Sequence, residues 1–174
     1  MRALLLVLVA CGSEAPAVAS APEPAPAPAP APAPVPAPAP APPLDLTGLD
    51  AAAQKAALMT LGEHVFKTGG NGGLACITCH GEDGKGMPGA FPPLAGQKDH
   101  MGDCAKHAGL VLNGLSGEIV VDGVKYNGVM VPQADKLSDS EIAAVLTYER
   151  HSFGNDLGVC LPSDVAAVRA KPAQ

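Results

Sequence analysis

The chain has 174 residues, and most of its 19 prolines fall in one stretch, so only part of it can form a folded domain. Its net charge of -6 and the lack of any run of lysine or arginine argue against nucleic acid as a partner. Aromatic residues make up 3% of the chain and tryptophan is absent, so a core of alanine, valine and leucine is thin for this length. A large apolar cofactor would help to fill it.

The first ten residues, MRALLLVLVA, carry one positive charge followed by apolar residues. Because about 20 apolar residues are needed to span a bilayer, residues 1–10 are predicted to be a signal peptide rather than a transmembrane helix. The stretch Leu8-Val9-Ala10-Cys11 resembles the lipobox of bacterial lipoproteins, in which cleavage leaves the cysteine to carry lipid. We therefore expect Cys11 to be lipidated. An ordinary signal peptide that happens to contain a cysteine is the alternative.

Residues 11–45 are dominated by alternating alanine and proline, with proline at every even position from Pro22 to Pro42. Proline lacks a backbone donor and keeps its predecessor extended, so this segment is predicted to be an extended linker. At about 3.1 Å per residue, its Ala-Pro run would reach on the order of 70 Å. Two roles are compatible with this composition. The length of the linker could set how far a tethered domain reaches, or the linker could be a passive connection whose length has no function. The folded domain is expected at residues 46–162, followed by a C-terminal tail at 163–174.

Three amphipathic helices are predicted in the folded domain, at residues 50–68, 104–115 and 139–151. The last has the clearest start, because Ser138 is followed three residues later by Glu141, the spacing of a capping box. A short β-hairpin is expected around Asp122-Gly123. The connecting loops are long for a small domain, and a bound prosthetic group would explain how they become ordered.

The sequence Cys76-Ile77-Thr78-Cys79-His80 can be read as a zinc half-site, a dithiol redox pair or a haem anchor. A zinc site would need two more ligands, and there is no second C-x-x-C. A thioredoxin-like dithiol follows a buried strand, whereas GGNGGLA precedes these cysteines. Two cysteines followed by a histidine match covalent haem attachment, with the histidine directed at the iron. The pattern therefore predicts one haem c attached through Cys76 and Cys79, with His80 as the proximal ligand.

Several separate stretches between Leu58 and Phe153 resemble the class I c-type cytochromes of bacteria. GEHVFKTGGNGGLACITCHGEDGKG resembles the amino-terminal helix and haem motif of that family, and LSDSEIAAVLTYERHSFGN resembles its carboxy-terminal helix. FPPLAG and YNGVMVP resemble two of its haem-contacting loops. The resemblance implies an all-α cytochrome c fold, in which helices and long loops wrap one covalent haem, with room for a small β-hairpin.

In that family the two terminal helices cross, which implies that Val145 and Tyr148 lie across Gly62 and Phe66. Phe153 stands near a position where the family often has tryptophan. The chain departs from the family pattern there but keeps an aromatic residue.

The iron needs a sixth ligand besides His80, and the residues alone leave several candidates. These are Met59, Met87, Met101, Met130, His64, His100, His107 and His151. Met87 is only seven residues beyond His80, whereas Met130 lies fifty residues on, in a loop that contains glycine and proline. The resemblance also implies Met130, and it implies that the backbone carbonyl of Pro92 orients His80. The other methionines are expected in the core and the other histidines at the surface.

Two cysteines, Cys104 and Cys160, remain once lipid and haem are assigned. An unpaired thiol is a liability in an oxidising compartment, so these two are predicted to form a disulfide. Closing so long a loop would stabilise the fold by about 4 kcal/mol in the chain-entropy model. Two separate buried thiols are the alternative.

Methionine-histidine ligation raises the potential of a haem relative to two histidines and leaves no vacant position on the iron. These properties favour electron transfer over catalysis, so we expect an electron carrier and not an enzyme. Its partners would be a membrane oxidase, reductase or dehydrogenase, met near residues 75–78 and 129–131. We expect a monomer in the cell envelope, facing the periplasm and anchored by lipid. Gly12 after Cys11 favours the outer membrane.

Two other functions are compatible with the same residues. The haem could act as a redox or gas sensor that signals by losing Met130. Alternatively, the chain could be the electron-entry subunit of a larger oxidase or dehydrogenase complex, whose catalytic centre lies on another polypeptide.

Overall fold

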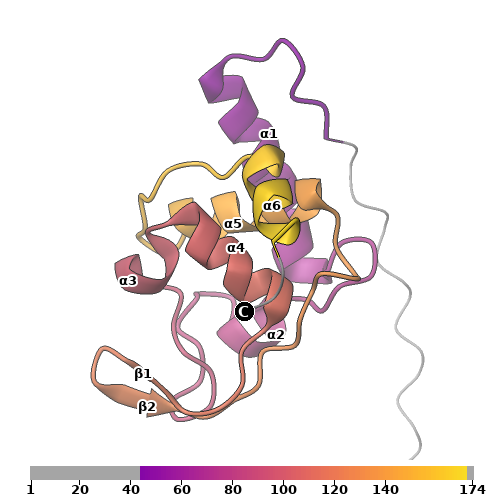
Figure 1. Ribbon diagram of the computed structural model, residues 1–174. Coiled ribbons are helices and arrows are strands. Elements are labelled where there is room, and N and C mark those ends of the chain that lie inside the picture. Colours follow the sequence, from indigo (N-terminus) through magenta and orange to yellow (C-terminus); the bar gives the residue numbers. More distant parts are fainter. Residues whose placement is uncertain (1–43, 172–174) are drawn as a thin grey trace, which may run out of the picture. The chain divides into compact units, whose positions relative to one another are not determined.

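The computed structural model describes residues 44–171 (Figure 1). The predicted signal peptide at 1–10, Cys11 and nearly all of the linker at 11–45 lie outside the described residues, as do residues 172–174. In chain order the elements are α1 (Ala51–Thr68), α2 (Ile77–His80), α3 (Lys98–Met101), α4 (Cys104–Asn113), β1 (Ile119–Val121), β2 (Val124–Tyr126), α5 (Asp139–His151) and α6 (Pro162–Arg169). The predicted all-α fold with a small hairpin is thereby confirmed.

The three predicted helices correspond to α1, α4 and α5. α4 ends two residues before its predicted end, because Gly114 takes a φ of 71°, which leaves the helical region. The hairpin turns where it was expected, with Asp122 and Gly123 at positive φ values of 50° and 78°. α2 and α3 are single turns, too short for a periodic pattern to reveal. None of the helices within residues 44–171 is long and apolar enough to cross a bilayer.

α1 and α5 cross at Gly62, where the two backbones approach closely. A Cβ atom added to Gly62 would lie 2.1 Å from the carbonyl oxygen of Ala144 and 2.7 Å from the Cβ of Tyr148. Glycine is therefore required at this position by space rather than by backbone angle. The family resemblance implied that Val145 and Tyr148 lie across this crossing. Tyr148 does lie opposite Gly62, but Ala144 and not Val145 makes the closest approach.

An aromatic cluster lies next to this crossing. The ring of Phe66 is 5.4 Å from the rings of both Tyr148 and Phe153, and the last two meet edge to face at 5.9 Å. Such tilted and edge-to-face contacts between aromatic rings stabilise a core beyond simple area burial. Phe153 thus packs the segment after α5 against Phe66 of α1.

α5 begins with the predicted capping box. The Ser138 hydroxyl accepts from the backbone N–H of Glu141, and the Glu141 carboxylate accepts from the backbone N–H of Ser138 at 3.0 Å. Side chains from Glu141 to Leu146 are all buried. A helix buried on several faces lies at the centre of its domain, and α5 contacts α1, α4 and α6.

α6, yellow in Figure 1, packs against α4 and α5. Residues 163–169, assigned from the sequence to a C-terminal tail, therefore belong to a helix that begins at Pro162 and buries Val165. Its last turn is tied to the start of α5, since Arg169 donates to the carboxylate of Asp139, the first residue of α5, at 2.7 Å and to the Leu137 carbonyl just before the helix at 2.9 Å. The structure also contains a disulfide between Cys104, at the start of α4, and Cys160, just before α6.

Gly62→Ala should destabilise the protein because its methyl group would overlap the backbone of α5. We expect the free energy of unfolding to fall by about 3 kcal/mol. Guanidinium denaturation of the full chain, followed by circular dichroism, measures this change. Gly109→Ala in α4 is the matched control, because nothing lies within 4 Å of its added Cβ. That variant should gain roughly 0.5–1 kcal/mol. Equal stability of the two variants would contradict the crossing described here.

Candidate functional site

One cavity brings together the five residues predicted to hold a haem. Cys76, Cys79, His80, Pro92 and Met130 all line it. Its walls come from the loop that leads into α2, the loop at residues 90–94, α4, the hairpin and the loop at residues 128–131. Most of the lining side chains are apolar, so the cavity suits a large, flat, mostly apolar ligand.

The two cysteines sit one helical turn apart at α2. Cys76 precedes the helix and Cys79 lies within it, and both are partly buried with free thiols. Burial, and after it the nearby Glu149 carboxylate, raises the pKa of the Cys76 thiol well above its ordinary value. The spacing and the shared cavity match the requirement of two thioethers to one porphyrin.

The tight turn before α2 depends on glycine. Gly69 ends α1 in the left-handed region at φ 83°. A Cβ there would lie 2.2 Å from the carbonyl oxygen of Gly73. These glycines let the chain reverse within five residues and deliver Cys76 to the cavity.

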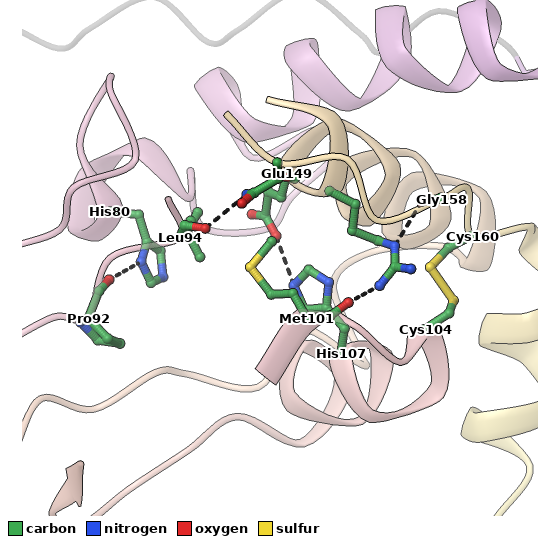
Figure 2. A network of polar contacts seen from close by, with 11 residues as sticks. His80, Pro92, Leu94, Met101, Cys104, His107, Glu149, Gly158 and Cys160 are labelled. Atoms are coloured by element: carbon green, nitrogen blue, oxygen red, sulfur yellow. Dashed lines mark hydrogen bonds and ion pairs between the residues drawn. A yellow bond between two sulfur atoms is a disulfide. The ribbon is translucent and has the colours of Figure 1, made fainter. Parts of the chain in front are cut away.

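His80 is oriented by the residue that the family resemblance implied. Its Nδ1 lies 3.0 Å from the backbone carbonyl oxygen of Pro92 (Figure 2). A carbonyl can only accept, so Nδ1 carries the proton and Nε2 keeps its lone pair. In metal-binding histidines, a hydrogen bond from the ring nitrogen that does not bind the metal fixes the orientation and the tautomer of the ring. His80 is thus prepared to bind a metal through Nε2.

The loop that carries Pro92 is anchored at both ends. Near its start, the Gly86 N–H donates to the His80 carbonyl at 2.8 Å. Near its end, Asn155 donates to the carbonyls of Leu94 at 2.9 Å and Glu149 at 3.0 Å. Asn155 was not singled out from the sequence, because nothing in its neighbourhood indicates contacts so far away along the chain.

The backbone of Met130 is held by a β-bridge. Its N–H donates to Leu115 at 2.8 Å, and its carbonyl accepts from Leu115 at 2.9 Å. On the other side, the Gly128 N–H donates to the Ala90 carbonyl at 2.9 Å. Met130 and His80, fifty residues apart, thus reach one cavity. Of the other methionines, Met87 is 53% exposed, while Met101 is buried and also lines the cavity.

Two side chains bind the loop before α2 to the segment around α5. Gln133 accepts from the Leu74 N–H at 3.0 Å and donates to the Val131 carbonyl at 3.0 Å. Glu141 accepts from the Asn71 N–H at 2.9 Å. The Gln133 bonds connect the loop before α2 to the loop that carries Met130, and the Glu141 bond connects it to α5. Glu141 was predicted only as a helix cap, and Gln133 carried no sequence signal.

His107 was expected at the surface, and that expectation is wrong. It is 4% exposed and lines the cavity from α4. Its Nε2 lies 3.0 Å from the carboxylate of Glu149 on α5. Glu149 is equally buried and lines the same cavity. The helical pattern placed neither residue on an inner face, because polar residues are read as outward-facing.

We expect Glu141 to make the stability of the loop before α2 depend on pH, because its carboxylate accepts from the Asn71 N–H in that loop. Burial raises the pKa of Glu141, but hydrogen bonds from Ser138 and Asn71 outweigh it, so the pKa lies below its ordinary value of 4.5. A carboxylate with a lowered pKa stabilises the fold above the unfolded-state pKa and loses this effect as pH falls through the folded-state pKa. Glu141→Gln should therefore lower the free energy of unfolding at pH 7 by about 1–3 kcal/mol.

Urea denaturation at several pH values checks this expectation. The difference between wild type and Glu141→Gln should shrink as the pH falls below 4.5. Glu63→Gln is the control, because its ion pair with Lys67 is exposed and should be worth less than about 1 kcal/mol. A difference that stays constant down to acid unfolding would show that the Glu141 charge does not hold the loop.

The family model for cytochrome c matches residues 59–151. Two proteins named cytochrome c-552, both from Thermus thermophilus, are each 47% identical to the chain over an alignment of 87 residues. Each alignment covers 46% of the chain. The matches cover 63% and 56% of those proteins, so the chain spans less than two thirds of their length. The family match covers more than half of the chain and includes both cysteines, His80 and Met130. The chain therefore belongs to the cytochrome c family, and its cofactor is haem c.

Proposed function

We propose that the protein carries single electrons between redox partners in the bacterial cell envelope. The observation that supports this function best is the meeting of four groups at one cavity. These are the two free cysteines, the Nε2 of His80 with its lone pair available, and Met130. When bound, haem c supplies the one-electron couple.

Each residue would have a separate part in this function. Cys76 and Cys79 would bind the haem covalently, while His80 and Met130 would occupy both axial positions of the iron. With both positions taken, no substrate can bind the metal, which favours electron transfer over catalysis. Histidine-methionine ligation and an apolar shell both favour a higher potential than two histidines would give.

Redox partners would meet the protein at an exposed apolar rim formed by Leu74, Val129 and Val131. These side chains line the cavity, yet they are 48%, 61% and 43% exposed. Exposed apolar side chains at a cavity mouth suit a small contact that dissociates quickly, as in redox encounters. The rim overlaps one of the two segments predicted from the sequence and adjoins the other, at residues 75–78.

Met130→Ala tests the axial ligand and, through it, the function. Wild-type reduced protein should resist carbon monoxide because Met130 occupies the iron. Met130→Ala should bind carbon monoxide, as seen in the visible spectrum, since alanine has no donor atom. Met87→Ala, which truncates an exposed methionine, should behave like wild type.

The same experiment separates a carrier from a haem-based sensor, and an electron-exchange assay tests the subunit alternative. Rapid carbon monoxide binding by wild type would favour a haem-based sensor over a carrier. Continued resistance of Met130→Ala would show that another residue is the sixth ligand. If the isolated chain exchanges no electrons with soluble redox partners but is reduced within a purified oxidase or dehydrogenase complex, it acts as a subunit of that complex.

We further propose that the protein is a lipoprotein held at a membrane, with the outer membrane favoured by Gly12. Support comes from the sequence of residues 1–45 alone. Wild type should incorporate labelled palmitate and remain in the membrane fraction. Cys11→Ser should do neither, because serine lacks the sulfur that carries lipid, whereas Ser13→Ala should match wild type. A wild-type protein that is processed without lipid would contradict the proposal.

A further inference from the structure

α4 and α5 place a buried acid-base pair beside the haem cavity. The Nε2 of His107 lies 3.0 Å from the Oε2 of Glu149, and each side chain is 5% exposed (Figure 2). Both residues line the cavity, and the Glu149 carboxylate, after burial, helps to raise the pKa of the Cys76 thiol. The pair is therefore close to the atoms that would join the haem to the protein.

Stability does not explain this pair. Taking two charged groups out of water is costly, and a buried ion pair is often no more stabilising than a well-packed apolar pair of similar size. The neighbouring Arg150 is engaged elsewhere, because its guanidinium donates to the carbonyls of Met101, Gly102, Leu157 and Gly158. A polar pair kept beside an apolar cavity is better explained by what it does for the bound cofactor.

His107 has one nitrogen still free to take a proton. Its Nδ1 is buried and has no hydrogen-bond partner among residues 44–171. Nε2 faces the Glu149 carboxylate, so Nδ1 is the remaining proton-accepting atom of the ring. An added proton there would be a new positive charge in a region where charges interact more strongly than in water.

We propose that the His107–Glu149 pair is a proton-binding site coupled to the redox state of the haem. One electron from a one-electron donor reduces ferric to ferrous iron, and one proton from the solvent binds at His107. On oxidation the electron passes to an acceptor and the proton returns to the solvent. No bond to the haem forms or breaks. The added electron makes the cavity more negative, which favours the proton, and by linkage the proton favours the electron equally. This inference rests on the proposed binding of haem in this cavity.

Other groups around the pair could titrate or respond to charge. They are His100 of α3 and Tyr126 of β2, which line the same cavity, Arg150 of α5, Asp103 and Lys106 at the start of α4, and Cys76 before α2. The thiol of Cys76 is consumed by haem attachment. His100 is the rival proton-binding site, because it is the other imidazole besides His80 that lines this cavity with His107. The haem propionates are the same in wild type and variants.

The test is the midpoint potential of the haem-loaded full chain, measured by spectroelectrochemistry across neutral pH. The wild-type midpoint potential should fall as pH rises. The equilibrium constant for reduction should decrease by up to tenfold per pH unit, which corresponds to about 59 mV for one electron. Photoreduction in weak buffer with an indicator dye should show a proton taken up with the electron. His107→Leu combined with Glu149→Leu should abolish both signals, and it leaves no unpaired buried charge.

His100→Asn is the control and should keep the wild-type slope. Glu149→Gln, which preserves size and hydrogen bonding, should move the sloping range to lower pH, so the proposal stays testable even if the double variant does not fold. A double variant with the wild-type slope, or wild type with a flat potential and no proton uptake, would overturn the proposal. A wild-type chain that binds no reducible haem would instead reject the proposed function.

Discussion

The close approach of α1 and α5 at Gly62 is the contact on which the functional site depends. It brings Phe66 against Tyr148, and Phe153 completes their cluster. Phe153 in turn lies against the loop after α2, since a Cβ at Gly84 would come 2.5 Å from its ring. Through these contacts the helix crossing supports the loop that follows α2.

The rest of the site is built from loops, and a few side chains take over the role that a core has elsewhere. Asn155 fixes the Pro92 loop to the end of α5, Gln133 fixes the loop before α2 to the Met130 loop, and Glu141 fixes that same loop to α5. The bonds from Asn155 to Leu94, from Leu74 to Gln133 and from Asn71 to Glu141 join residues that are 59 to 70 positions apart in the chain. Loops held in this way can present apolar side chains to a flat cofactor and so complete a core that is short of aromatic residues.

The sequence predicted those parts of the site that depend on chemistry with fixed spacing. The C-x-x-C-H pattern singles out Cys76, Cys79 and His80, and the structure places all three at one cavity. The capping box at Ser138 and the turn at Asp122-Gly123 follow from local backbone chemistry. What it did not predict depends on tertiary contacts. α6 was taken for a tail because eight residues give little periodicity, and His107 with Glu149 was missed because each looks solvent-exposed until the partner helix is placed.

The central claim is that Cys76 and Cys79 bind one haem through two thioethers, and the reduced spectrum in alkaline pyridine tests it most directly. After extraction with acidified acetone, the haem should remain with the protein and show the absorption of a porphyrin with both vinyl groups saturated. Haem that is extracted into the acetone, or that keeps the spectrum of a free vinyl group, would contradict the account.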